Sequence, residues 1–137
     1  MEAKESSFIE ITSNENRFEI PFFQRAYVWK KGNWEKLFDD LFQSYQDKSS
    51  PFLGSIILKR NQGLNNICYV IDGQQRLTTF SILLKSIIDQ INKKVTSFEN
   101  CLFDENYNGR DIKISHSHID KQRYEEVLTN KQSKGIS

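Results

Sequence analysis

A short polar segment, Asp72 to Arg76, holds the side chains of this sequence that are best suited to chemistry. It reads Asp-Gly-Gln-Gln-Arg, so a carboxylate, two amides and a guanidinium fall within five consecutive positions. An apolar run that predicts a buried strand ends where the segment begins, and a helical apolar pattern follows it. A helix that starts directly after a strand presents free backbone N–H groups, which favour anions. The segment therefore predicts a site for a phosphate group or a nucleotide.

Each residue type in this segment has a role that such a site needs. The planar guanidinium of Arg76 matches phosphate oxygens, and the two glutamine amides could donate to phosphate or read a base. Asp72 could hold a divalent cation or position a water molecule, which makes it the candidate catalytic residue. The candidate nucleotide-binding residues of this stretch are Asp72, Gly73, Gln74, Gln75, Arg76 and Thr78.

A purely structural interpretation of the same segment stays open. Asp72 would then cap the helix, Gly73 would form the turn, and the Gln and Arg side chains would point into solvent. The segment also lacks the spacing of a Walker P-loop.

A second amide and guanidinium pair, Gln24 and Arg25, lies in an aromatic segment that begins at Pro21. Tyr27 and Trp29 follow that pair, so the segment could stack a base and contact phosphate. In the alternative interpretation, which these residues taken alone favour, the aromatic side chains belong to the core and Arg25 forms a salt bridge.

The remaining candidate ligands do not predict a metal site. His116 and His118 alternate as metal ligands on a strand can, but no third ligand is near them in the sequence. We therefore assign both to solvent or to capping of the last helix. Cys68 and Cys101 are too few for a thiolate site or a disulfide framework and are interpreted as buried structural residues.

Bulk composition excludes several classes of protein. The 137 residues suffice for one domain, which we expect to span residues 1–137. The formal net charge of +1 gives no general attraction to nucleic acid or membranes, so a basic patch would have to be local. No apolar run approaches the length of a membrane span, and the polar N-terminus is not a secretory signal. A cytoplasmic location is the expectation.

Apolar periodicity predicts the elements that position these segments. The predicted strands are residues 17–20, 52–60, 67–71 and 111–115, and the predicted helices are residues 34–45, 77–91 and 119–128. Strands 52–60 and 67–71 are expected to form a hairpin across a turn at 61–66, and a second turn is expected at 106–110. Interleaved strands and helices with few βαβ crossovers predict an α+β fold with a small mixed sheet.

Four further expectations concern individual residues and helix faces. Asn33 is the expected N-cap of the first strong helix. The helix at 77–91 has so broad an apolar surface that we expect it to be central and largely buried. In the last helix Tyr124, Val127 and Leu128 are expected to face inward, and the apolar patch at 8–11 is either part of a helix or a strand.

Three ordered motifs resemble the N-terminal domain of GmrSD-type restriction proteins, which are type IV, modification-dependent endonucleases. The motifs are Ile20–Trp29, Phe52–Ile56 and Ile71–Thr79, and the similarity covers most of residues 8–130. The resemblance implies a fold related to ParB and sulfiredoxin. It also implies that Asp72–Arg76 is the nucleotide-linked motif of the family, and that Gln24 and Arg25 approach the same pocket from across the sheet.

The resemblance further implies a function. The domain is expected to bind an NTP, with or without Mg²⁺, and to regulate an anti-phage restriction system. DNA would be contacted through the full-length protein or a partner nuclease domain. NTP hydrolysis by this chain is left open, and nuclease activity is not expected, because the chain has no HNH-like arrangement and is expected to be C-terminally incomplete. The alternatives are a ParB-like DNA-binding module without chemistry, which the near-neutral charge disfavours, and a structural partner domain.

Overall fold

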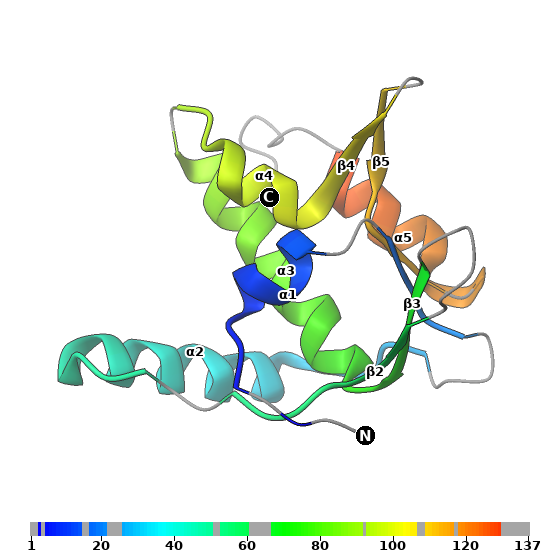
Figure 1. The fold of residues 1–137 in the computed structure, drawn as a ribbon. Helices are drawn as coiled ribbons and strands as arrows, with labels where there is room; N and C mark the ends of the chain where they lie inside the picture. Colours follow the sequence, from blue (N-terminus) through cyan, green and yellow to red (C-terminus); the bar gives the residue numbers. More distant parts are fainter. Residues whose placement is uncertain are drawn as a thin grey trace.

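The computed structural model describes residues 3, 5–14, 17–21, 26–50, 53–60, 67–91, 93–106, 109–116 and 118–129. Helices and strands are interleaved along this part of the chain (Figure 1). The helices are α1 (Phe8–Asn14), α2 (Lys31–Asp47), α3 (Gln74–Gln90), α4 (Thr96–Leu102) and α5 (His118–Thr129). The strands are β1 (Arg17–Glu19), β2 (Ile57–Arg60), β3 (Ile67–Asp72), β4 (Phe103–Asn106), β5 (Gly109–Ile112) and β6 (Ile114–Ser115).

The main sheet is mixed and has the strand order β2-β3-β1-β6. Strand β1 runs parallel to both of its neighbours, β3 and β6, whereas β2 pairs antiparallel with β3. Strands β4 and β5 form a separate antiparallel pair. This arrangement confirms the predicted α+β fold with a small mixed sheet, and it confirms the antiparallel pairing of the two hairpin strands. The turn predicted at 61–66 lies outside the described residues.

The core lies between the main sheet and the helices α3 and α5. Strand β3 buries alternate side chains, Cys68 and Val70, as expected for a strand with one covered face. Phe18 from β1 and Leu77 from α3 are fully buried against them. Both cysteines are free thiols in buried positions, which confirms their structural interpretation.

The segment after residue 94 differs from its prediction. Helix α4 and strand β4 were not expected, since a seven-residue helix is too short to give a clear apolar period. The strand expected at 111–115 is broken at Lys113, so that β5 pairs with β4 and β6 pairs with β1. Lys113 is buried at the break, where its Nζ donates to the Thr12 carbonyl at 2.8 Å and its N–H donates to the Leu102 carbonyl at 2.9 Å.

Several helix details also differ. Val127 was expected to face inward, but its side chain is 44% exposed, because Tyr124 and Leu128 lie one turn apart on a different side of α5. Helix α2 begins at Lys31 rather than after Asn33, whose Oδ1 instead accepts the Lys30 N–H from within the first turn at 2.9 Å. The patch at 8–11 belongs to a helix.

Helices α2 and α3 bury different amounts of their apolar surface. Helix α3 runs through the middle of the molecule, and its first half is buried as expected, whereas Ile87 in its second half is 43% exposed (Figure 1). Helix α2 projects from the body as an arm and buries none of its residues.

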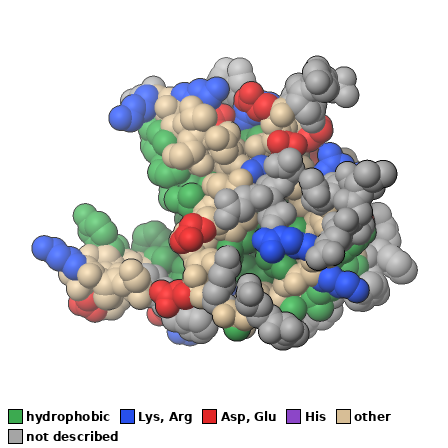
Figure 2. Space-filling view, in the orientation of Figure 1, with side chains coloured by type: hydrophobic (Ala, Val, Ile, Leu, Met, Phe, Trp, Pro, Cys, Tyr) green, Lys and Arg blue, Asp and Glu red, His purple; other side chains and the backbone are tan. Residues whose placement is uncertain are grey.

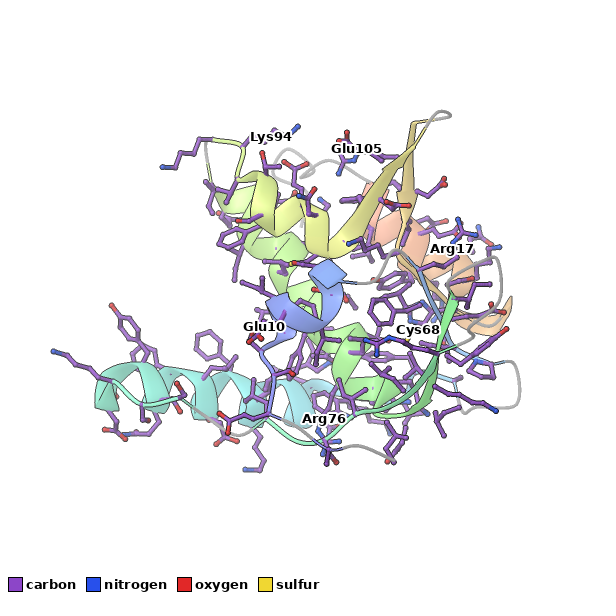
Figure 3. All side chains as sticks on the ribbon, in the orientation of Figure 1. Glu10, Arg17, Cys68, Arg76, Lys94 and Glu105 are labelled. Atoms are coloured by element: carbon purple, nitrogen blue, oxygen red, sulfur yellow. The ribbon has the colours of Figure 1, made fainter. Side chains whose placement is uncertain are left out.

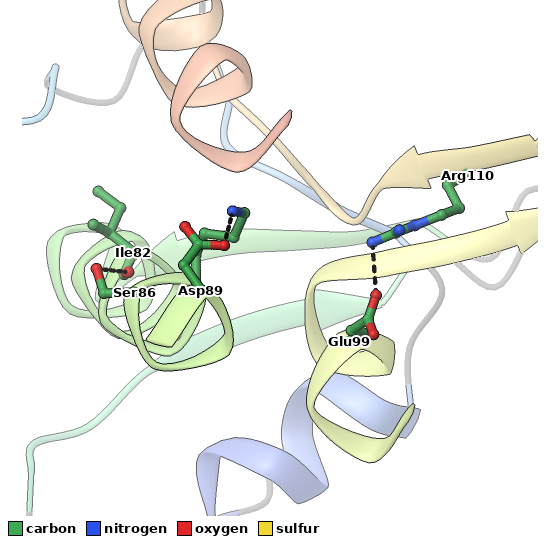
Figure 4. Close-up of polar contacts among 6 residues, drawn as sticks. Ile82, Ser86, Asp89, Glu99 and Arg110 are labelled. Carbon is green, nitrogen blue, oxygen red and sulfur yellow. Dashed lines mark hydrogen bonds and ion pairs between the residues drawn. The ribbon is translucent and has the colours of Figure 1, made fainter. Parts of the chain in front are cut away.

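Polar contacts fasten the outer elements. Arg110 of β5 forms an ion pair with Glu99 of α4 at 3.2 Å, and its guanidinium also lies 3.9 Å from the centre of the Phe103 ring (Figure 4). The β4–β5 pair is thereby tied to α4. No helix in the described part of the chain is long and apolar enough to cross a membrane.

Candidate functional site

Three segments that are distant in the sequence meet at the start of α3. The Gln75 side chain donates to the Ala26 carbonyl at 3.0 Å and accepts the Val28 N–H at 2.9 Å. On the other side of the helix start, Gly73 and Arg76 contact the segment that leads into β2. The junction that the sequence singled out, strand β3 followed by a glycine and a helix, is therefore the meeting point of all three motifs.

Two glycines make this meeting possible. Gly73 has a φ of +97°, and a Cβ there would lie 2.9 Å from the Ile56 Cγ1 atom and 3.1 Å from the Ser55 carbonyl oxygen. Gly54 has a φ of +113°, and a Cβ there would lie 2.3 Å from the Arg76 Nε atom. Side chains rarely adopt such φ values, and at both positions the space is already filled. Gly54 thus lets the Arg76 side chain lie directly across the backbone.

The start of α3 keeps the features of an anion site. The first hydrogen bond of the helix runs from the Leu77 N–H to the Gly73 carbonyl at 3.0 Å. The N–H groups of the residues before Leu77 therefore make no hydrogen bond within the helix itself. No side chain in the described part of the chain caps this helix. Asp72 is exposed, and its Oδ1 accepts the Gly73 N–H at 3.0 Å. The turn therefore uses the Gly73 N–H as one donor, and the positive end of the helix dipole lies at this buried junction.

Arg76 is half-buried in the first turn of α3, and Figure 3 labels it near the N-terminal end of this helix. Among the described residues, none forms an ion pair or hydrogen bond with its guanidinium. A half-buried cation of this kind favours an anionic partner from outside the chain.

A small recess lies on the other side of the same helix turn. It encloses about 210 Å³ of empty space, part of it open to solvent. Its lining comprises Ile20, Tyr27, Gln74, Gln75, Thr78, His116 and Asp120. Because each helical residue turns by about 100°, Arg76 points about 200° away from both Gln74 and Thr78. The structure thus brings Gln74, Gln75 and Thr78 to the recess and leaves Asp72, Gly73 and Arg76 outside it.

A chain of hydrogen bonds of defined direction closes one wall of the recess. The Thr79 hydroxyl donates to the Gln75 carbonyl at 2.8 Å, so its oxygen is free to accept from the Tyr27 hydroxyl at 2.6 Å. The Tyr27 oxygen in turn accepts the Trp34 Nε1–H at 2.7 Å. Tyr27 is therefore held rigidly, with an edge toward the recess.

His116 was expected in solvent or as a cap of the last helix, and the solvent-exposed alternative is wrong. Its ring is 8% exposed, its Nε2 lies 2.8 Å from the Thr78 hydroxyl, and it packs against Tyr124. Burial lowers the pKa of His116 to about 4, and the nearby Asp120 carboxylate only partly opposes this shift. The imidazole is therefore neutral at pH 7 and adds no charge to the recess.

Asp120 is a recess residue that the sequence did not reveal. Its Oδ2 accepts the Tyr27 N–H at 2.6 Å, which ties α5 to the aromatic segment. Its only sequence signal was its place in the first turn of the last helix. Gln24 and Arg25, the other predicted pair, lie outside the described residues, although Ala26 directly after them contacts Gln75.

The described residues contain no group of three His, Cys, Asp or Glu side chains that could hold a metal ion. Any divalent cation here would need ligands from a bound molecule in addition to one carboxylate such as Asp72.

The model of a protein family described as GmrSD restriction endonuclease, N-terminal domain, matches residues 8–137. No curated protein matches the chain. The matched range includes α3, both glycines and every residue that lines the recess.

Proposed function

We propose, from the premise that this chain belongs to the family of GmrSD restriction endonuclease N-terminal domains, that it binds a nucleoside triphosphate across the start of α3. The family itself supports a role in restriction, and hence in defence, with DNA as the molecule acted upon. In this proposal the nucleotide regulates a nuclease activity that resides elsewhere, in the full-length protein or in a partner, and DNA is contacted there.

One observation carries the nucleotide part of this proposal. The half-buried Arg76 guanidinium has no partner among the described residues and lies beside a helix start that no described side chain caps. A triphosphate would satisfy both features, since guanidinium and first-turn N–H groups both bind phosphate oxygens. By comparison, Arg110 is paired with Glu99 and has an evident structural role.

The dimensions of the recess determine how a nucleotide would lie. The enclosed part of the recess is only about 10 Å³, far less than the roughly 300–1,000 Å³ of a typical small-molecule site. A whole nucleotide therefore does not fit inside. The phosphates would lie at Arg76 and the start of α3, and a base would reach the mouth of the recess, which Gln74 helps to line.

The other predicted residues then have distinct roles. Gln75 and Thr78 position the site, because Gln75 holds the segment with Tyr27 and Thr78 holds His116. Asp72, exposed at the junction, would provide the single carboxylate that Mg²⁺ commonly takes alongside phosphate oxygens. Bound Mg²⁺ would neutralise phosphate charge. Asp72 also stays the candidate for positioning a water molecule if hydrolysis occurs.

A binding measurement with matched arginine variants tests the proposal. ATP, GTP, CTP and UTP are titrated with and without Mg²⁺, by calorimetry and by thermal shift. A nucleotide at 100 times its dissociation constant should stabilise the fold by about 2.7 kcal/mol, which is several degrees in melting temperature. Arg76→Ala should weaken binding by about tenfold or more, because a hydrogen bond to a charged group contributes roughly 1.5–3 kcal/mol.

Two further variants make this test specific. Arg123→Ala removes an equal charge from an exposed position on α5 and should leave affinity unchanged. Gly54→Ala keeps Arg76 but displaces its side chain, and should weaken binding in the same way as Arg76→Ala. The proposal fails if no nucleotide binds, or if a folded Arg76→Ala variant binds as tightly as the parent.

A further inference from the structure

Helix α2 carries an apolar face that is open to solvent. Its aromatic stripe, defined here as Trp34, Phe38, Phe42 and Tyr45, is 45%, 60%, 51% and 80% exposed, respectively. The Phe38 and Phe42 rings stack on each other with centroids 6.3 Å apart. In Figure 2 hydrophobic side chains are visible along the projecting arm, and the surface is hollowed between the arm and the body.

Apart from the bond made by Trp34, the fold makes little use of this stripe. Helix α2 is fastened at its base, where Trp34 donates to Tyr27, and along an inner edge, where Leu37 and Leu41 are half-buried. The aromatic stripe lies to the other side of that edge. Three aromatic side chains of the stripe, Phe38, Phe42 and Tyr45, are therefore more than half exposed and have no packing role against the body in the described part of the chain.

The exposed apolar area of the aromatic stripe is large enough for a protein–protein interface. Buried aromatic side chains cover about 150–250 Å² each, so the exposed fractions correspond to roughly 500 Å² on one copy. This lies toward the upper end for the largest apolar patch of a monomer, about 300–600 Å². Two such faces in contact would bury roughly 1,000 Å², which is about the lower limit for a specific interface.

The spacing and charge of α2 indicate its partner. Trp34, Phe38, Phe42 and Tyr45 are separated by four, four and three residues, so they lie along one side of α2, as the residues of a helix–helix contact do. Residues 30–36 contain three Lys and one Glu, for a net charge of +2, whereas residues 39–48 contain three Asp and one Lys, for a net charge of −2. A second α2 in antiparallel orientation would place each basic half against an acidic half, whereas a parallel one would oppose like charges.

We infer that the aromatic stripe is a dimer interface, on which α2 of a second copy of this chain packs in antiparallel orientation. The arrangement is symmetric, so the same surface serves both copies and closes the assembly at two. The seam also lies close to the candidate site, since Trp34 of the stripe donates to Tyr27 of the recess wall. This inference does not depend on nucleotide binding.

The mass of the full chain in solution tests the interface. Sedimentation velocity between about 1 and 100 µM should show the mass rise from 16.1 kDa to twice that value, with weaker association at high salt. Phe38→Glu should keep the chain monomeric over this range. Val127→Glu, which changes a residue that is 44% exposed on α5, should not. The inference is overturned if the wild-type chain stays monomeric, even if the stripe captures some other protein. It is also overturned if the dimer survives Phe38→Glu.

Cysteine pairing tests the orientation. Positions 35 and 46 are eleven residues apart, nearly three full turns, and so lie on the same side of α2. In the antiparallel dimer Glu35 of one copy lies near Gln46 of the other, so a short bismaleimide should join Glu35→Cys chains to Gln46→Cys chains only when the two are mixed. The native cysteines are buried and serve as an internal background. Cross-linking of either variant to itself at an equal rate would indicate a parallel pair and contradict the inference.

Discussion

At the scale of single residues, Arg76 differs from two other arginines in the described part of the chain, Arg17 and Arg110. Arg110 is held by Glu99 and by the face of Phe103, and Arg17 pairs with Asp111 at 3.7 Å. Arg76 has no such partner in the described part of the chain. Its side chain fits only because position 54 is a glycine, where a Cβ would occupy the same space. A cation that is positioned but left unpaired stays available to an anionic ligand.

His116 leads to a prediction about stability and pH. Its pKa is about 6.5 in the unfolded chain and about 4 in the folded one, so between these values only the unfolded chain takes up the proton. The contribution of neutral, buried His116 to the stability of the fold is therefore fully present above pH 6.5 and is lost as the pH falls toward 4. We expect the free energy of unfolding to drop by about 2 kcal/mol between pH 7 and pH 5 in urea denaturation.

The variant His116→Gln provides the control for this pH dependence. It removes the titrating ring and should flatten the loss of stability between pH 7 and pH 5. An unchanged slope in that variant would mean that other groups cause the loss.

At the scale of elements, the contact between α3 and the segment at 26–28 depends on one side chain. Gln75 satisfies the Ala26 carbonyl and the Val28 N–H together, as a neighbouring strand would. The recess wall with Tyr27 is positioned by this contact and by the bond from Tyr27 to Asp120.

Gln75→Ala should therefore loosen the wall of the recess. We expect a loss of about 1–3 kcal/mol in the free energy of unfolding, because two polar backbone groups lose their partner. Gln122→Ala on α5 removes an exposed amide that bonds only to Glu126, and should change stability by less than about 0.5 kcal/mol. Equal effects of the two variants in urea denaturation would show that the Gln75 contact is not structural.

At the scale of the whole molecule, stability should follow the position of the core rather than hydrophobicity along the chain. Leu77 is fully buried between α3 and the sheet, while Ile87, on the same helix, is 43% exposed. The two residues have similar side-chain volumes, so they form a matched pair.

Leu77→Ala should cost about 2–5 kcal/mol of unfolding free energy, as expected for a buried leucine that leaves a cavity. Ile87→Ala should cost less than about 1 kcal/mol, because most of its cavity would be filled by solvent. Denaturant midpoints at equal slope measure both values. A large loss at Ile87 would indicate that the second half of α3 is covered in solution.

The sequence by itself determined the local features of this protein. The strand, glycine and helix around Gly73, the paired strands β2 and β3, and the last helix with Tyr124 and Leu128 inward all follow from periodicity and turn chemistry within short windows. The family was also evident from three short motifs, and the match over residues 8–137 confirms it. The nucleotide, its residues and the ParB-like relationship stay predictions.

Only the tertiary structure decided which side of each helix faces which neighbour. A local pattern fixes the rise and turn of a helix, but its rotation against the rest of the molecule depends on residues far away in the chain. For that reason Arg76 and Thr78 face opposite sides of α3, His116 is buried, and the apolar stripe of α2 is exposed. Gln75 reaches Ala26 across 49 residues, a contact that no local pattern could reveal.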